Sequence, residues 1–183
     1  MKSFILLVDD EQNVLSALKR ELAEEPYEVV TAQSGEEGLS LLESHSFKVI
    51  ISDERMPGMD GAEFLAAAKE LSPQSVRFML TGHASIDATM KAVNNCEIYR
   101  FFTKPWNSME LKQAILSAIE RYDLEDENRR LLKVVKRQSQ ELRALEIHHP
   151  GISTLRKDKE GAFVLPEISD DELQQLMEEY GQK

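Results

Sequence analysis

The chain has 183 residues, of which 33 are Asp or Glu and 22 are Lys or Arg, for a formal net charge of −11. This length fits one domain of ordinary size with an appendage, but not two full domains. So acidic a surface repels a phosphate backbone, which argues against DNA or RNA as the partner. The only cysteine, Cys96, cannot form an internal disulfide, as is typical of a reducing compartment.

The sequence shows no secretory signal and no membrane span. The first apolar run, residues 4–8, is followed at once by acidic residues, which is untypical of a signal peptide. No stretch approaches the roughly 20 apolar residues that a membrane span needs. We therefore expect a cytoplasmic protein without a membrane partner.

Short apolar runs alternate with amphipathic segments through the first 120 residues. The runs interpreted as strands are residues 4–8, 27–31, 47–51, 76–80 and 98–102. Helical spacing follows each run, Ser34 is placed to cap the second helix, and the last helix begins near Ser108. Because crossovers between parallel strands are right-handed, the alternation predicts an α/β fold with helices on both faces of a parallel sheet.

Polar residues follow four of the five predicted strands. Asp9 and Asp10 follow the first strand, Asp53 the third, Thr81 the fourth and Lys104 the fifth. Taken alone, Asp53 could equally cap the next turn, and a lysine after a strand is usually solvated. However, the carboxyl ends of parallel strands meet at one edge of the sheet, where ligands bind. The set is therefore more specific than its members.

These residue types together favour phosphoryl chemistry. Carboxylates gathered at one place repel one another unless a cation neutralises them, so Asp9, Asp10 and Asp53 imply a metal ion. Mg²⁺ fits best, because it takes one or two carboxylates and keeps waters and phosphate oxygens in its other positions. Lys104 adds a positive charge and Thr81 a hydroxyl donor, the groups that bind a phosphoryl group's oxygens.

The motifs Asp9-Asp10, Asp53 to Gly61, Thr81 and Lys104-Pro105 resemble the receiver domain of bacterial two-component response regulators. The resemblance covers residues 1–120 and implies a flavodoxin-like, doubly wound five-stranded sheet in the order 2-1-3-4-5. It implies that Asp53 accepts a phosphoryl group from a sensor histidine kinase or phosphotransfer protein. It also implies that Asp10 binds Mg²⁺ with Asp9 and Asp53, and that the Arg55 carbonyl completes the metal site.

The same resemblance implies that Thr81 and Lys104 contact the phosphoryl oxygens and that the Lys104-Pro105 peptide bond is cis. It further implies a switch in which Thr81 moves toward the phosphoryl group and an aromatic ring, by position Phe101, turns inward. Phenylalanine lacks the hydroxyl that would hold the ring in water, so we hypothesise an inward bias even without phosphate. The alternative is that Phe101 is an ordinary core residue of an edge strand.

Two further residues flank the expected phosphoryl position. Arg55 and His83 each lie two residues beyond a site residue, and we predict that they set how fast water removes the phosphoryl group from the covalently phosphorylated Asp53. The alternative is that both side chains are merely solvated. Apart from this self-dephosphorylation we expect no enzymatic activity.

Residues 97–106 are similar to a narrower group, the receivers of HD-GYP phosphodiesterases and hydrogenase-type regulators. No HD or GYP motif follows in the sequence, so we expect no such catalytic domain in this chain.

The last helix meets no helix breaker before Pro150 and carries a heptad pattern. The seam consists of Leu124, Asn128, Leu131, Val135, Gln138, Leu142 and Leu145. It predicts a coiled-coil homodimer through residues 124–145, with Asn128 favouring an in-register pair. One alternative is a single helix folded back on its own receiver. Another is a zipper-like DNA binder. However, acidic residues stand where its basic region should continue, so we expect no DNA partner; they are Asp123, Glu125, Asp126 and Glu127.

Residues 150–183 predict a small tail. His148 and His149 lack further metal-binding neighbours and are more typical of a solvated helix end than of a metal site. Residues 152–155 and 162–165 predict a hairpin, and a capping-box sequence at residues 169–172 precedes an amphipathic helix. So small a tail must pack on another surface.

The sequence therefore predicts a receiver domain (1–120), a helical coiled coil (121–149) and a tail (150–183). We expect a response regulator that signals to an unknown protein target without a DNA-binding output domain. One alternative is a phosphorelay or phosphate-sink receiver. Another is a detached regulatory subunit of a cyclic-dinucleotide enzyme.

Overall fold

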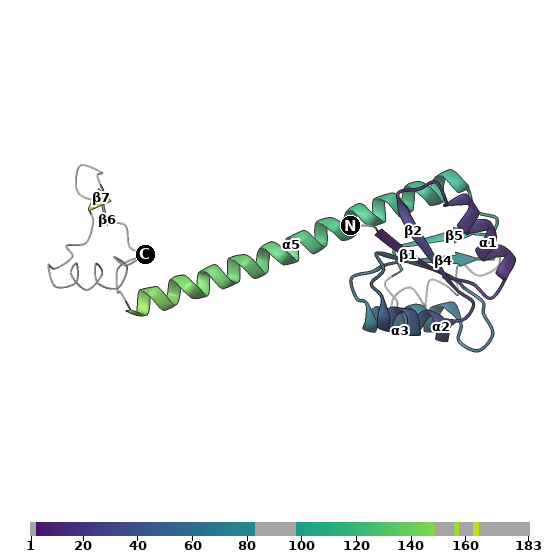
Figure 1. The fold of residues 1–183 in the computed structure, drawn as a ribbon, viewed down its shortest axis with the longest axis horizontal. Helices are drawn as coiled ribbons and strands as arrows, with labels where there is room; N and C mark the ends of the chain where they lie inside the picture. The colour runs from purple at the N-terminus through teal and green to yellow at the C-terminus, as the bar shows by residue number, and fades with distance from the viewer. Residues whose placement is uncertain (1–2, 83–97, 149–155, 158–162, 165–183) are drawn as a thin grey trace, which may run out of the picture. The chain divides into compact units, whose positions relative to one another are not determined.

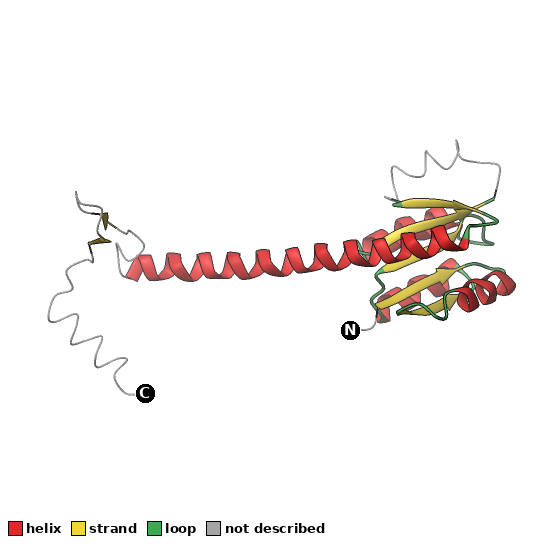
Figure 2. Ribbon diagram, turned by 90° about the horizontal axis from the view of Figure 1, so that it is seen from above, coloured by secondary structure: helices red, strands yellow, loops and turns green. Residues whose placement is uncertain are grey.

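The structure is a computed structural model that describes residues 3–82, 98–148, 156–157 and 163–164. A five-stranded parallel sheet has the order β2-β1-β3-β4-β5 (Figure 1, Figure 2). Its strands are β1 (Ser3–Val8), β2 (Tyr27–Ala32), β3 (Val49–Asp53), β4 (Val76–Thr81) and β5 (Arg100–Thr103). The predicted α/β class and strand order are confirmed.

Two strands begin later than the apolar pattern indicates. The predictions for residues 47–51 and 98–102 were wrong in their bounds, since β3 begins at Val49 and β5 at Arg100. Phe47 and Ile98 are buried at 1% and 8% exposure, although both precede the strands. An apolar pattern reports burial, whereas a strand's bounds depend on which residues pair with the neighbouring strand.

Helices cover both faces of the sheet (Figure 1). They are α1 (Gln12–Glu21), α2 (Gly35–Ser44), α3 (Gly61–Leu71) and α5 (Ser108–His148). Alternate residues of β1 show the two layers: Ile5 and Leu7 pack in the core with α1 and α5, whereas Leu6 and Val8 pack with α2 and α3. The helix predicted near residues 86–93 lies outside the described residues.

Side-chain caps begin two of these helices. Ser34 accepts a hydrogen bond from the Glu37 amide at 3.2 Å, as predicted. At α3, Asp60 accepts from the Glu63 amide at 2.8 Å, and the Glu63 carboxylate accepts from the Asp60 amide at 3.2 Å. This capping box fixes where the chain turns from the loop after β3 into α3.

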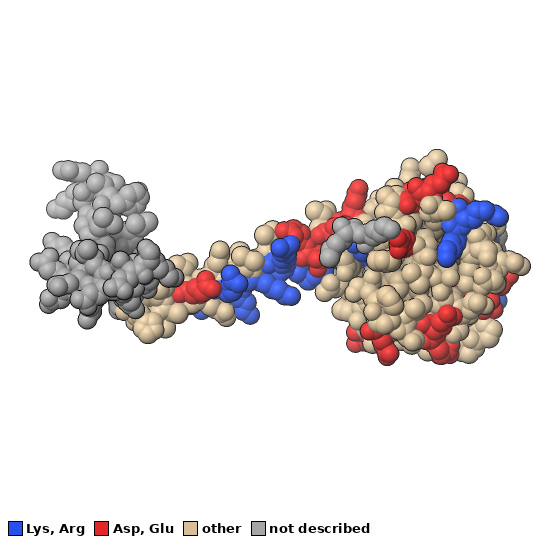
Figure 3. All heavy atoms as spheres, viewed as in Figure 1, with Lys and Arg blue, Asp and Glu red and all other residues tan. Residues whose placement is uncertain are grey.

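The helix α5 runs unbroken over 41 residues, as the lack of Pro and Gly predicts. Its first turns bury Leu111, Ala114 and Ile115 against the sheet. The chain divides within this helix into two compact units, Met1–Glu127 and Asn128–Lys183. Beyond the first unit, Lys and Arg side chains are frequent along α5 (Figure 3).

A small antiparallel hairpin follows α5. Strand β6 (Arg156–Lys157) pairs with β7 (Phe163–Val164). β7 lies inside the predicted second strand, whereas β6 follows the residues predicted for the first strand and includes Lys157, which was expected in the turn. The predicted first strand, residues 152–155, and the predicted tail helix lie outside the described residues.

Candidate functional site

The ends of four strands place the predicted site residues at one edge of the sheet. Asp53 is the last residue of β3 and Thr81 the last of β4, while Asp9 and Lys104 directly follow β1 and β5. Because these strands are parallel neighbours in the order β1-β3-β4-β5, their carboxyl ends lie together. The strand order and the strand ends thus confirm the prediction that these residues meet at one edge of the sheet.

Lys104 joins two carboxylates from different strands. Its ammonium lies 2.5 Å from Asp53 Oδ1 and 2.8 Å from Asp9 Oδ2. The side chain of Asp9 is 1% exposed and that of Asp53 10%. Two acidic groups so deeply buried need compensation, and Lys104 provides it by hydrogen-bonded charge pairing.

The pairing and the burial act in opposite directions on the pKa values. Burial raises the pKa of the Asp9 carboxyl, and hydrogen bonds from Lys104 and from the Glu11 amide lower it. Burial has the larger effect, so the pKa lies above its ordinary value. For Lys104, burial lowers the pKa, but its bonds to Asp53 and Asp9 outweigh burial and the pKa is raised. Lys104 is therefore held charged, while the charged form of Asp9 is destabilised by its surroundings.

Backbone amides hold the other oxygen of each carboxylate. The Arg55 amide donates to Asp53 Oδ2 at 3.0 Å, and the Glu11 amide donates to Asp9 Oδ1 at 2.9 Å. These bonds orient both carboxylates toward the same lysine. The sequence did not indicate them, because they depend on how the chain turns after each strand.

Glycines shape the turn after Asp53. Gly58 has φ +80°, which side-chain-bearing residues rarely adopt. Gly61, the first residue of α3, packs so closely on the carbonyl of Asp53 that a Cβ atom there would overlap it. The Pro/Gly-rich motif therefore lets α3 approach the backbone at the end of β3.

Thr81 has a partner that the sequence reasoning missed. Its hydroxyl donates to Glu54 Oε2 at 2.5 Å, and the Gly82 carbonyl lies 3.0 Å away. Thr81 itself is 3% exposed. Glu54 belongs to the motif from Asp53 to Gly61, but the sequence indicated no role for it. The signal that could have found it is its place one residue beyond the end of β3, next to the end of β4.

The other residues predicted for the site differ in how exposed they are. Asp10 and the side chain of Arg55 are exposed. Phe101 on β5 is half-buried and packs against the core on the α2 and α3 side. His83 lies outside the described residues. The Lys104-Pro105 peptide bond is cis, as predicted.

Comparison with known proteins identifies the family. Residues 5–116 match the response regulator receiver domain. The chain belongs to this family. It is 36% identical over 127 residues to the hydrogenase transcriptional regulatory protein HoxA of Cupriavidus necator, covering 69% of this chain and 26% of HoxA. The predicted similarity to hydrogenase-type regulators is confirmed. The chain thus spans about a quarter of this curated relative's length.

Solved structures agree with the receiver assignment. A structure described as adenylate cyclase from Rhodopirellula baltica has a TM-score of 0.68 and 42% identity, covering 73% of this chain and 98% of that one. The receiver domain of an HD domain-containing protein from Pseudomonas fluorescens has a TM-score of 0.65 and 35% identity, covering 67% of this chain and 98% of that one.

Among the residues that the structure describes, no helix is long and apolar enough to cross a membrane.

Two of the carboxylates predicted to bind a magnesium ion, those of Asp9 and Asp53, lie close together. Within the described residues, no three acidic, histidine or cysteine side chains converge closely enough to form a metal cage by themselves. Asp9 and Asp53 do converge, because both contact the same Lys104 ammonium. Mg²⁺ commonly takes one or two carboxylates and completes its shell with waters and phosphate oxygens, so two converging carboxylates suffice.

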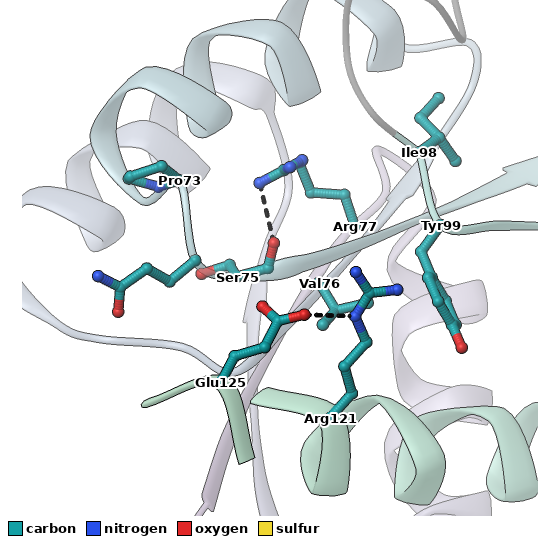
Figure 4. A pocket seen from close by; sticks show the side chains of 9 residues that line it. Pro73, Ser75, Val76, Arg77, Ile98, Tyr99, Arg121 and Glu125 are labelled. Atoms are coloured by element: carbon teal, nitrogen blue, oxygen red, sulfur yellow. Dashed lines mark hydrogen bonds and ion pairs between the residues drawn. The ribbon is translucent and has the colours of Figure 1, made fainter. Parts of the chain in front are cut away.

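A polar pocket lies at the opposite edge of the receiver sheet (Figure 4). Residues before and at the start of β4 line it, together with Tyr99 and part of α5. Its charged groups are satisfied from within: Arg121 bonds Glu125 at 2.7 Å, and Arg77 donates to the Ser75 carbonyl at 2.8 Å. The pocket lies at the amino ends of the strands, so it is separate from Asp53, Thr81 and Lys104 at their carboxyl ends.

Proposed function

We propose that the chain is a response regulator whose Asp53 is phosphorylated by a sensor histidine kinase or phosphotransfer protein. The observation that supports this most is the burial of Asp53 at a strand end with the Lys104 ammonium 2.5 Å from Oδ1. An Asp53 oxygen forms a bond to phosphorus as the phosphorus–nitrogen bond of phosphohistidine breaks. The bonding electrons leave with the imidazole nitrogen, which takes up a proton.

The chain's own residues then have defined roles. Lys104 neutralises charge on the acyl phosphate, and Thr81 donates its hydroxyl to a phosphoryl oxygen. Asp9, Asp10, Asp53 and the Arg55 carbonyl would hold Mg²⁺, which offsets the negative charge of the transferred group. Phe101 would follow Thr81 as the switch residue.

Phosphorylation is tested by intact-mass spectrometry after incubation with acetyl phosphate. With Mg²⁺ the protein should gain the mass of one phosphoryl group. Asp53→Ala should gain none, and chelation of Mg²⁺ by EDTA should abolish the gain in the wild type. Equal labelling of Asp53→Ala, or no labelling of the wild type, would contradict the proposal.

We further propose that α5 forms a homodimer through residues 124–145. In the single chain, Leu124, Leu131, Val135, Leu142 and Leu145 are between 47% and 70% exposed. Exposed apolar side chains at heptad spacing on an unbroken helix favour a second copy as the covering surface. The output would then be a protein contact made by the dimer in the cytoplasm, without a DNA-binding domain.

A transcriptional output is the second candidate, because HoxA is named a transcriptional regulatory protein. Lys and Arg side chains are also frequent along the part of α5 beyond Glu127 (Figure 3). Fluorescence anisotropy with labelled duplex DNA separates the two. The protein-contact proposal expects no binding near 0.15 M salt with or without beryllofluoride, whereas a DNA-binding output expects binding that weakens steeply with salt.

A further inference from the structure

We propose that Glu54 is a positioning residue that holds the Thr81 hydroxyl away from the phosphoryl position until Asp53 is phosphorylated. This inference rests on the proposed phosphorylation of Asp53. It assigns the residue after the phosphoacceptor a part in setting how readily the site activates.

The contact itself is short and partly shielded from water. Thr81 Oγ donates to Glu54 Oε2 at 2.5 Å, and Thr81 is 3% exposed. A distance this short is typical of a hydroxyl bonded to an ionised carboxylate, which is about twice as strong as a bond between neutral groups. The nearby Gly82 carbonyl, at 3.0 Å, is a longer and neutral second acceptor.

The backbone fixes Glu54 beside Thr81. The Glu54 amide donates to the Leu80 carbonyl at 2.8 Å, which extends the pairing of β3 with β4 by one residue. On its other side, the Glu54 carbonyl accepts from the Gly61 amide at 3.0 Å. Glu54 is therefore held between β4 and the start of α3, and its side chain lies next to Thr81, the residue after Leu80.

The hydroxyl of Thr81 has one proton and therefore one strong bond to give. A phosphoryl group on Asp53 brings up to two negative charges and competes with Glu54 for that proton. Thr81 must break its bond to Glu54 before it can donate to the phosphoryl group. Glu54 is half-buried, so water can replace the lost donor only in part. The contact therefore favours the unphosphorylated arrangement.

Replacing the carboxylate by an amide weakens this hold while keeping the side-chain size. Glu54→Gln should tighten the binding of beryllofluoride with Mg²⁺, because Thr81 is released at lower cost. Hydrogen bonds to charged groups are strong enough for the loss of one to change an equilibrium about tenfold. We expect tightening of roughly five- to twentyfold.

A double-mutant cycle separates this mechanism from simple charge repulsion. Isothermal titration calorimetry measures beryllofluoride binding to the wild type, Glu54→Gln, Thr81→Ala and the double variant. The fluorescence of Trp106, the only tryptophan, provides a second readout of the same titrations. If Glu54 acts through Thr81, Glu54→Gln changes the affinity less than about twofold when Thr81 is already absent.

Three results would overturn the inference: unchanged affinity in Glu54→Gln, weaker binding, or equal tightening with and without Thr81. The control is Glu125→Gln, which removes the same charge at the opposite edge of the sheet and should bind like the wild type. Thermal unfolding without ligand checks that each variant is folded.

If the wild type does not bind beryllofluoride, or Asp53→Ala binds it equally, the proposed phosphorylation itself fails. Wild-type binding that needs Asp53 but ignores Glu54→Gln contradicts only the role of Glu54.

Discussion

The Lys104 ammonium lies 2.5 Å from Oδ1 of Asp53, the residue proposed to accept the phosphoryl group. The same ammonium also contacts the buried carboxylate of Asp9 at 2.8 Å. One cation therefore compensates two acidic groups from different strands. Its removal should affect both the fold and the chemistry.

Lys104→Met should lower the rate of phosphorylation from acetyl phosphate by about a hundredfold, the typical effect of removing one electrostatic donor. It should also lower the melting temperature without Mg²⁺, because Asp9 and Asp53 lose their cation. Adding Mg²⁺ should recover much of that stability. Lys48→Met is the matched control, since it removes a lysine paired with Asp123 at 2.6 Å, away from the site. Equal rates in the two variants would contradict the assigned role.

Asp9→Asn should raise the melting temperature at neutral pH. The pKa of Asp9 is raised by burial above its ordinary 3.8, so the folded protein binds this proton more readily than the unfolded chain. The charged carboxylate therefore costs stability at neutral pH, and the cost disappears as pH falls through the raised pKa toward 3.8.

The measurement for Asp9→Asn is thermal unfolding as a function of pH, with and without Mg²⁺. The stability gain of the variant should shrink in acid. Mg²⁺ should stabilise the wild type more than the variant, because ligand binding to the folded state adds stability. A variant less stable than the wild type at neutral pH, or equal stabilisation by Mg²⁺, would refute this account.

Gly61→Ala should destabilise the protein by about 1–3 kcal/mol, the usual cost of overpacking, and should slow phosphorylation. The added Cβ would overlap the Asp53 carbonyl, so β3 or α3 must shift. Gly82→Ala is the control at the end of β4, because a Cβ there meets nothing within 4 Å. Chemical denaturation and intact-mass labelling check both variants, and similar behaviour of the two would contradict the expectation.

Replacing Leu131 and Leu142 together by Ala should weaken self-association by at least about a hundredfold, as expected when two seam residues lose apolar burial. Sedimentation velocity should find a dimer for the wild type and a monomer for the double variant at low concentration. Ile147→Ala, outside the predicted seam and 77% exposed, should remain dimeric. A monomeric wild type would rule out the proposed dimer.

Much of the site could be predicted from the sequence, because local patterns indicate near which residues the strands and helices end. Asp53, Thr81 and Lys104 each stand at or directly after a strand, and the parallel order brings these ends together. The length of α5 could also be predicted, since no Pro or Gly interrupts residues 108–148. These features depend on residues close to one another in the chain.

The contacts that tune the site were decided by the tertiary structure. Thr81 and Glu54 are 27 residues apart in the sequence, and Lys104 and Asp9 are 95 apart. Whether such pairs meet depends on strand register and on how closely α3 approaches β3 at Gly61. Periodicity indicates which side of an element is buried, but not which distant side chain lies opposite. The sequence by itself thus determined the residue types at the sheet edge, and the packing of the strands decided their partners.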